Sequence, residues 1–234
     1  MKYTYQENTF TIDRYPTTDN KSLQAWSAAD EHILNYLEEE KISCEKAVIY
    51  NDRFGFLSTI LADKDPTAII DFKSQEKTFA FNFEDNGLEQ NLKTNSSIDE
   101  LKGEFDLALI KIPKSLDLFR LQLAQAQASL SENGQVICGF MTKYFSKQYL
   151  TIAAEYFEDC SQSKAWKKSR ILILKGKKAV EKENLITEIQ FSGNKVFKQH
   201  YGVFSAKYID HATQFFIDHM DVRLDHNKIL DLGS

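Results

Sequence analysis

Short apolar runs alternate with segments of helical periodicity along most of the chain, and this alternation restricts the fold more than any other feature. The apolar runs lie at residues 47–50, 68–70, 107–110, 135–138 and 171–174. Helical spacing is predicted between them at residues 56–62, 115–130 and 145–157, and residues 74–86 have a mixed pattern. Strand-sized apolar runs separated by helices indicate an α/β fold, in which a mostly parallel, twisted sheet is buried between two layers of helices.

A further amphipathic helix is predicted at residues 21–40, ahead of the first apolar run. Its apolar side chains, which recur at helical spacing, are Leu23, Trp26, Ala29, Ile33, Leu34 and Leu37. Thr17, Thr18 and Asp19 precede it as candidate N-cap residues, because their side-chain oxygens can accept hydrogen bonds from the first free amides of a helix. This helix is expected to cover one face of the sheet.

The composition is that of a folded protein rather than a disordered or membrane-spanning one. Of 234 residues, 42% are hydrophobic and 27% are charged, and only 3 are prolines. No stretch approaches the roughly 18 uninterrupted apolar residues of a membrane span, and the start of the chain lacks the basic and apolar regions of a secretory signal. We therefore expect a cytoplasmic protein with no membrane contact, made of one full-sized domain and a further piece.

Cysteine and histidine spacing argues against a metal site. The three cysteines, Cys44, Cys138 and Cys160, are far apart and form no Cys-x-x-Cys pair, so they are predicted to be small, mostly buried side chains. Four of the five histidines fall within residues 200–226, but no two are three to five residues apart, as ligands on one helix face are. The sequence therefore predicts no metal ion.

Positive charge is concentrated in one segment of a chain whose formal net charge is -5. Residues 164–178 contain seven basic residues and no acidic one, namely Lys164, Lys167, Lys168, Arg170, Lys175, Lys177 and Lys178. Lysines of this kind commonly solvate an edge strand and discourage its pairing with another chain. The alternative is a phosphate-binding stripe, whose affinity for its ligand would fall with salt because counterions are released. Composition alone favours the edge-strand interpretation.

Loops that follow the strands are where a sheet of this kind binds ligands. The first main strand is followed by Asn51, Asp52, Arg53, Phe54 and Gly55. A loop that cradles a nucleotide needs several glycines, so that backbone amides can approach the ligand, and only Gly55 is present. Asp71 follows the second strand, where an acid can accept hydrogen bonds from ribose hydroxyls, although a strand-end aspartate is also an ordinary turn residue. The sequence thus predicts a degenerate cofactor pocket at Asn51, Asp52, Gly55 and Asp71.

The loop after the third main strand reads Lys111-Ile112-Pro113-Lys114-Ser115. Pro113 is expected to end the strand, because proline cannot donate to a sheet ladder, and Ser115 is expected to cap the following helix. These structural roles account for the loop without any chemistry.

Several motifs together resemble the family of ribosomal RNA guanine-N2 methyltransferases that includes RlmG and RsmC. The first group comprises Arg14-Tyr15-Pro16-Thr17-Thr18-Asp19, Leu23-Gln24-Ala25-Trp26 and Ala28-Ala29-Asp30-Glu31. The second comprises Asn51-Asp52-x-Phe54-Gly55-x-Leu57-Ser58, Leu109-Ile110-Lys111-Ile112-Pro113-Lys114 and Ala165-Trp166-Lys167-Lys168-x-Arg170. The likeness continues through Val203-Phe204-Ser205, Asp210, Phe215-Phe216 and Leu230-Asp231-Leu232-Gly233. It spans nearly the entire chain and is closer to RlmG, which acts on 23S ribosomal RNA.

The resemblance implies a tandem duplication of the class I methyltransferase fold, which is Rossmann-like. Residues 1–185 would form a degenerate amino-terminal copy. Lys111 and Lys114 stand where an active copy carries an Asn-Pro-Pro-Phe loop that holds the target base, but both lysines can contact phosphate.

Residues 186–234 would form a linker and the start of the catalytic copy, according to the same resemblance. Phe204, Asp231 and Gly233 would belong to the S-adenosylmethionine site of that copy, and the sequence ends inside the cofactor loop at Ser234. S-adenosylmethionine is therefore expected in the full-length protein and not on this chain, which as given is expected to be inactive.

The resemblance further implies that the amino-terminal copy holds ribosomal RNA, in particular protein-free 23S RNA, for its own carboxy-terminal catalytic domain. The predicted RNA-binding residues are Lys111, Lys114, Lys164, Trp166, Lys167, Lys168 and Arg170, since an aromatic ring among basic side chains offers a stacking surface beside phosphate-binding charges. An alternative for Trp166 is a core or interdomain anchor. Two other roles stay open for the copy: a scaffold for the catalytic half that does not bind RNA, and residual S-adenosylmethionine binding.

Overall fold

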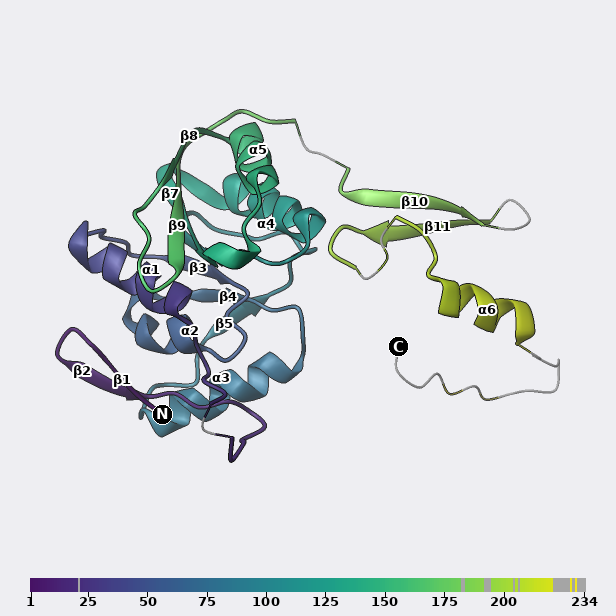
Figure 1. Cartoon of the computed structure of the whole chain (residues 1–234). Helices are drawn as coiled ribbons and strands as arrows, with labels where there is room; N and C mark the ends of the chain where they lie inside the picture. The colour runs from purple at the N-terminus through teal and green to yellow at the C-terminus, as the bar shows by residue number, and fades with distance from the viewer. Residues whose placement is uncertain are drawn as a thin grey trace. The chain divides into compact units, whose positions relative to one another are not determined.

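The computed structural model describes residues 1–20, 22–181, 184–191, 195–203, 205, 207–220, 228 and 230 (Figure 1). The chain divides into two compact units, Met1–Asn184 and Leu185–Ser234. Each unit is a separate body and is described by itself below.

A seven-stranded sheet forms the centre of the first unit, and its strands lie in the order β5-β4-β3-β6-β7-β9-β8. Their bounds are β3 Ala47–Tyr50, β4 Thr67–Ile69, β5 Lys93–Asn95, β6 Phe105–Lys111, β7 Leu130–Met141, β8 Phe157–Gln162 and β9 Ser169–Lys177. Only β9 pairs antiparallel with its neighbours, and the other neighbouring pairs are parallel. The predicted α/β fold with a mostly parallel sheet is therefore confirmed.

Helices cover both faces of this sheet because the central strands are apolar on both sides. Val48 and Tyr50 of β3 pack with α4 (Leu116–Ser129) and α5 (Lys147–Tyr156), whereas Ile49 packs with α1 (Ala28–Glu39) and α2 (Phe56–Ile60). All four residues of β3 are buried, as is typical of parallel strands between two helical layers. Figure 1 shows α4 and α5 grouped together and α1 and α2 on the other side of the sheet.

The first helix begins later than its periodicity predicts. It starts at Ala28 rather than at residue 21, because the carboxylate of Asp30 accepts hydrogen bonds from the backbone amide and the hydroxyl of Ser27, at 2.7 and 2.8 Å. This reciprocal capping box satisfies amides that would otherwise be free at the helix start. Thr17, Thr18 and Asp19, the predicted cap residues, lie in the preceding loop.

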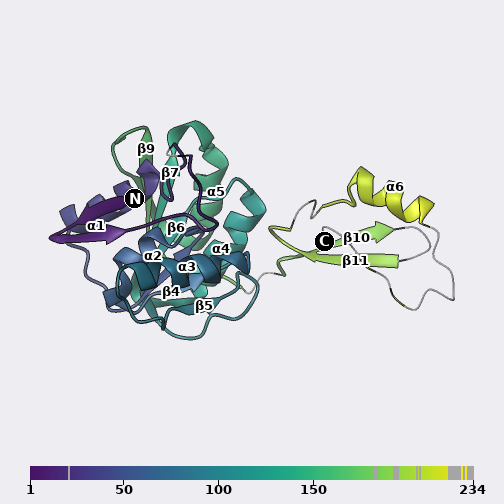
Figure 2. The ribbon, with the colours of Figure 1, turned by 90° about the horizontal axis from the view of Figure 1, so that it is seen from below.

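Four elements of the first unit are absent from the sequence-based expectation. Figure 2 shows the hairpin of β1 (Lys2–Tyr5) and β2 (Asn8–Thr11) in purple at the N-terminus. The ring of Tyr3 in this hairpin meets edge-on the rings of Trp26, which precedes α1, and Phe56, which begins α2. The edge strands β5 and β8 are also missed, because their residues are mostly polar and partly exposed. The segment 74–86, whose sequence pattern is mixed, forms helix α3 (Ser74–Asp85). Two short 3-10 helices, η1 (Ala62–Lys64) and η2 (Thr142–Tyr144), are also present.

The described residues of the second unit form an antiparallel hairpin and one helix. Strands β10 (Ile186–Phe191) and β11 (Lys195–His200) pair along their whole length, and α6 (His211–His219) follows. The side chain of Asp210 caps α6 by accepting hydrogen bonds from the amides of Ala212 and Thr213. Among all the helices that the structure describes, none is long and apolar enough to cross a membrane.

Candidate functional site

The order of the strands creates a natural ligand-binding position between β3 and β6. From β3 the chain continues to β4 and β5 on one side, whereas from β6 it continues to β7 on the other. Ligands of open α/β sheets bind at the carboxyl ends of the two strands where the direction reverses. Asn51 follows β3 and Lys111 ends β6, so the structure brings these two predicted residues to that position.

Asn51 fills this position with its own side chain. Its backbone is left-handed at φ +60°, a conformation that asparagine adopts more readily than most residues. Its Nδ2 donates to the carbonyl oxygen of Lys111 at 2.7 Å and to Oε1 of Gln122 at 2.8 Å, and Nε2 of Gln122 donates back to Oδ1 at 2.8 Å. Because Gln122 is completely buried in α4, this paired amide contact fixes β3, β6 and α4 to one another.

The turn after Asn51 is also closed by side chains of the protein itself. The carboxylate of Asp52 accepts hydrogen bonds from the amide and the hydroxyl of Ser58, both at 2.8 Å, and therefore points toward α2. Burial raises the pKa of Asp52, and the two hydrogen bonds from Ser58 oppose that rise. Gly55 has φ +74°, and a β-carbon at this position would lie 2.7 Å from Cδ1 of Phe79, so the ring of Phe79 occupies the space above the only glycine of the turn.

Asp71, the fourth predicted pocket residue, lies where the sequence places it, after β4. Its carboxylate accepts a hydrogen bond from the hydroxyl of Ser97 at 3.0 Å, and burial raises its pKa. Oε1 of Gln75 accepts the backbone amides of Asp71 and Phe72. Asp71 is nevertheless exposed, and Ser97 is the one hydrogen-bond donor to its carboxylate among the described contacts, so this turn by itself does not exclude a ribose.

The turn of Asn51, Asp52 and Gly55 does not fit an adenosyl group. A nucleotide loop needs open backbone amides and small residues, whereas Asn51 and Asp52 are engaged by buried partners and Gly55 is covered by Phe79. The prediction that the first unit binds no cofactor stays a prediction, and these contacts are its structural basis.

Lys111 and Lys114, which the sequence treats alike, have different environments. Nζ of Lys111 lies 3.0 Å from Oδ2 of Asp30, whose side chain is 0% exposed. Burial lowers the pKa of Lys111, but the charge and hydrogen bond of Asp30 outweigh it and raise that pKa overall. Lys114 is exposed and lies above the ring of Tyr144, with Nζ 5.4 Å from the ring centroid. Only Lys114 therefore has an ammonium group free to meet phosphate without breaking a buried ion pair.

Lys167 and Lys168 form a tight two-residue turn between Trp166 and Ser169, in the connection from β8 to β9. Trp166 and Ser169 exchange both backbone hydrogen bonds, at 2.9 and 2.7 Å, and the two residues between them have φ +44° and +62°. Turns of this geometry favour asparagine and glycine, because a β-carbon clashes with the backbone at positive φ. Lys167 and Lys168 occupy these positions instead, so the turn exposes two ammonium groups despite an unfavourable backbone.

Replacing Lys168 with glycine is expected to raise the free energy of unfolding by about 1 kcal/mol, because glycine relieves the strain at φ +62°. Chemical denaturation of the wild type and the variant measures this difference. Lys175→Gly in the middle of β9 is the matched control, and it should lower stability by about 0.5–1 kcal/mol. Equal destabilisation by both changes would contradict the strained-turn interpretation.

Trp166 packs partly against the protein and is not fully free. Its ring centroid lies 5.6 Å from that of His32, and Nζ of Lys167 lies 4.3 Å above the ring. Lys167 also pairs with Glu31 at 3.0 Å. Trp166 thus combines the two interpretations made from the sequence, since it anchors the turn and still presents an edge among basic groups.

The basic segment 164–178 is not one continuous surface. Lys164 and Arg170 are exposed near the 166–169 turn. Lys177 and Lys178, at the opposite end of β9, donate to the backbone carbonyls of Leu130 and Ala154. The structure therefore brings residues 164–170 together and removes the last two lysines from that group, because a nine-residue strand separates them.

Two exposed residues that the sequence reasoning missed lie beside this turn. Lys143 and Tyr144 belong to η2, directly after β7, and the amide and hydroxyl of Thr142 both donate to the carbonyl of Lys168, at 2.9 and 3.1 Å. A sequence signal existed, because residues 133–154 contain two lysines and no acidic residue.

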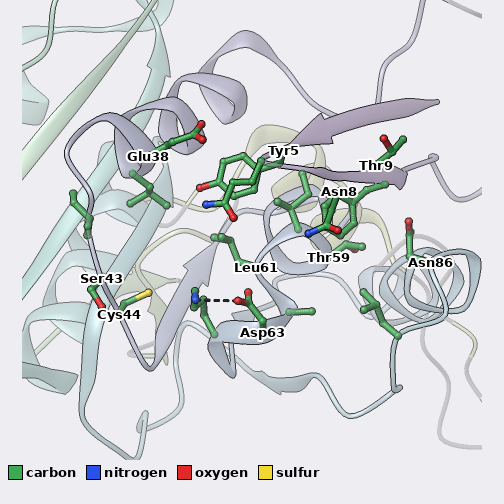
Figure 3. A pocket seen from close by; sticks show the side chains of 18 of the residues that line it. Tyr5, Asn8, Thr9, Glu38, Ser43, Cys44, Thr59, Leu61, Asp63 and Asn86 are labelled. Carbon is green, nitrogen blue, oxygen red and sulfur yellow. Dashed lines mark ion pairs between the residues drawn. The ribbon is translucent and has the colours of Figure 1, made fainter.

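A separate pocket of about 650 Å³ lies between the β1–β2 hairpin, the end of α1 and the segment before β3 (Figure 3). Tyr5, Glu38 and Cys44 line it, and Asp63 pairs with Lys64 at 2.9 Å. Burial raises the pKa of the Cys44 thiol, with Lys64 opposing the rise, so this thiol is not activated as a nucleophile. None of the RNA-binding or cofactor-site residues predicted from the sequence lines this pocket.

The remaining two predictions concern the cofactor loop of the second unit and metal binding. Phe204, Asp231 and Gly233, predicted for the cofactor loop of the second unit, lie outside the described residues. Among the residues that are described, no three His, Cys, Asp or Glu side chains are grouped so as to hold a metal ion.

Two family models match the sequence. The RLMG N-terminal domain matches residues 1–179, and the Methyltransferase small domain matches residues 194–234.

Two curated relatives carry the name Ribosomal RNA large subunit methyltransferase G. The protein from Shewanella sp. (strain MR-4) is 33% identical over 228 residues, which cover 94% of this chain and 60% of that relative. The protein from Pectobacterium atrosepticum is 30% identical over 227 residues, which cover 95% of this chain and 60% of that relative. This chain therefore spans about 60% of the length of the relatives it matches.

Solved structures show the same fold at lower identity. The Thermus thermophilus 16S rRNA N2 G1207 methyltransferase RsmC, in complex with AdoMet and guanosine, is 14% identical, with a TM-score of 0.61 over 93% of this chain and 57% of that chain. A ribosomal protein L11 methylase from Lactobacillus delbrueckii is 16% identical, with a TM-score of 0.52 over 64% of this chain and 80% of that chain. These likenesses show the class I methyltransferase fold. Because the RLMG N-terminal domain matches more than half of its residues, the chain belongs to the RlmG family.

Proposed function

We propose that this chain is the RNA-recognition part, together with the beginning of the catalytic domain, of an S-adenosylmethionine-dependent ribosomal RNA (guanine-N2-)-methyltransferase that acts on 23S RNA. The relatives that share about 60% of their length with it are named for methylation of the large ribosomal subunit RNA. Residues 186–234 would begin the catalytic domain, since the Methyltransferase small domain matches residues 194–234. Phe204, Asp231 and Gly233 would then help to hold the cofactor.

The role proposed for residues 1–185 is to hold RNA without catalysing the reaction. The observation that carries it is the contrast at the carboxyl ends of the strands. Asn51, Gln122 and Phe79 close the ligand position of the sheet, while two lysines are held at the strained tip of the β8–β9 turn. Unfavourable backbone that persists in a folded domain commonly marks a functional site. Ribosomal RNA and the carboxy-terminal catalytic domain are the proposed partners.

RNA binding by this turn is expected to be electrostatic and therefore salt-dependent. Each lysine that neutralises a phosphate releases a counterion, so log affinity falls linearly with log salt concentration. Lys167 and Lys168 have ammonium groups at the turn, and the nearby exposed Lys164 and Arg170 add two more charges. Trp166 orients the turn through its contact with His32.

The double change Lys167→Glu and Lys168→Glu is expected to weaken binding of protein-free 23S RNA about 10- to 100-fold at low salt. It should also reduce the slope of log affinity against log salt by about 1–2, because two phosphate contacts are lost. Fluorescence anisotropy at low and moderate salt measures both quantities. Lys102→Glu is the control for a charge reversal away from the turn, since Lys102 is exposed in the loop before β6, at the amino ends of the parallel strands.

The same titration separates the proposed function from the scaffold role. If the wild type binds RNA weakly and without salt dependence, or if the double variant and Lys102→Glu behave alike, RNA recognition by this turn is wrong. A domain that only braces the catalytic half would give that result.

A further inference from the structure

Tyr144 presents an exposed aromatic ring between two lysines. The residue is 55% exposed. Nζ of Lys143 lies 4.5 Å from the ring centroid, and Nζ of Lys114 lies 5.4 Å from it. These three side chains, called the Tyr144 platform below, come from two separate loops at the carboxyl ends of β6 and β7.

The backbone under the Tyr144 platform is firmly held, although the ring itself is exposed. The next residue, Phe145, stacks on Phe140 at 4.1 Å and on Tyr149 at 5.6 Å between centroids. The hydroxyl of Tyr149 donates to the carbonyls of Pro113 and Lys114, at 2.8 and 3.2 Å. Tyr149 therefore ties the loop of Lys114 to the loop of Tyr144, and the platform is preorganised rather than assembled by chance on a mobile surface.

The platform is linked to the basic turn at the start of β9. Thr142 precedes Lys143, and its amide and hydroxyl both donate to the carbonyl of Lys168. Thr142 therefore fixes the backbone of the Tyr144 platform to the backbone of the Lys167–Lys168 turn. A nucleic-acid strand can contact both, because the platform offers one ring for stacking and both sites carry ammonium groups for phosphate.

The charges around Tyr144 favour an anionic partner. A hydrogen bond from Lys143 and its charge, with a smaller effect of Lys114, lower the pKa of the Tyr144 phenol. The surrounding segment 133–154 contributes no acidic residue. Solvation of an ordinary loop would account for the two lysines. It would not account for both ammonium groups lying close to the same exposed ring.

A nucleobase can compete for the ring with the ammonium groups. A cation–π contact at an exposed site contributes less than the stacking of one base on an aromatic side chain. A stacked base would displace one ammonium group, which would then lie at the height of the flanking phosphates. A charge-assisted contact between that ammonium group and a phosphate would replace the lost cation–π contact.

We propose that the Tyr144 platform binds one unpaired nucleotide of RNA, with the base stacked on Tyr144 and the flanking phosphates contacted by Lys114 and Lys143. This inference rests on the proposed function, since it places a second contact beside the Lys167–Lys168 turn. It also narrows the substrate, because a base can stack on a side chain only where the RNA is unpaired.

The test compares two fluorescein-labelled probes, a 12-nucleotide single-stranded RNA of mixed sequence and a perfectly paired RNA duplex of the same length. Tyr144→Ala in the full chain is expected to weaken binding of the single strand about 5- to 100-fold and to change duplex binding by less than about twofold. Tyr144→Phe should bind the single strand like the wild type, because it keeps the ring. Thermal unfolding of both variants controls for folding.

The outcomes separate this inference from the proposed function. If the wild type shows salt-dependent binding and Tyr144→Ala matches it on the single strand, the platform is wrong while RNA recognition stands. Equal losses on the single strand and the duplex would also overturn stacking. If the wild type binds neither probe, nor protein-free 23S RNA, the proposed function itself fails.

Discussion

Replacing Lys111 with alanine is expected to lower the free energy of unfolding by about 3 kcal/mol. Breaking a buried ion pair by removing one partner typically costs about 3–5 kcal/mol, because the remaining charge is left without compensation. Asp30 is 0% exposed, and its Oδ1 has no hydrogen-bond partner, so Lys111 is its counterion. The lower end of the range applies, since Lys111 keeps 26% of its side-chain exposure. Urea denaturation measures the loss.

Lys114→Ala is the matched control for Lys111→Ala, because it removes a lysine from the same loop. Lys114 is exposed, so its removal should change stability by less than about 0.5 kcal/mol. The double variant Asp30→Asn with Lys111→Met should recover much of the lost stability, since it removes both charges and keeps the acceptor that caps α1. Equal stability of the two single variants would show that the Asp30–Lys111 pair contributes nothing.

Gly55→Ala is expected to lower the free energy of unfolding by about 2–4 kcal/mol. One part is backbone strain, since φ at Gly55 is +74°. The other part is a clash, because the new β-carbon would lie 2.7 Å from Cδ1 of Phe79, whose side chain is only 3% exposed and has little room to move. Denaturation of the variant at neutral pH measures the sum of both parts.

Gly87→Ala separates the two parts of this effect. Gly87 has φ +64°, but nothing lies within 4 Å of the added carbon, so only the backbone strain of about 1 kcal/mol remains. Adding Phe79→Leu to Gly55→Ala should cost less than the sum of the two single changes, because the smaller side chain makes room for the new carbon. Strict additivity would mean that Phe79 does not close the turn above Gly55.

The central strands could be predicted from the sequence because their side chains are apolar on both faces. The apolar runs at residues 47–50 and 107–110 predict buried strands, and the structure pairs them side by side as β3 and β6. The edge strand β5 and the hairpin of β1 and β2 escaped prediction, since half-exposed strands contain polar residues and lack a continuous apolar run. For β5 the pairing partner, β4, also lies well before it in the sequence.

The candidate site was predictable only in part. The single glycine in the 51–55 turn already indicated a poor nucleotide loop, but the residues that close it, Phe79 and Gln122, lie in helices that carry no sign of that role. Tyr144 was missed although residues 133–154 lack acidic side chains, because an isolated tyrosine becomes a candidate stacking surface only once two lysines from different loops are known to surround it.

The sequence by itself determined the class of fold and the region of the sheet where chemistry should be sought, because hydrophobic periodicity is local and follows the geometry of each strand and helix. Only the tertiary structure decided which basic residues act as structural counterions and which face outward. Lys111 and Lys114 are three residues apart and chemically identical, yet one pairs with Asp30 of α1 and the other lies over Tyr144. The environment of a charged group depends on elements brought together by folding, and that information is not contained in the spacing of residues along the chain.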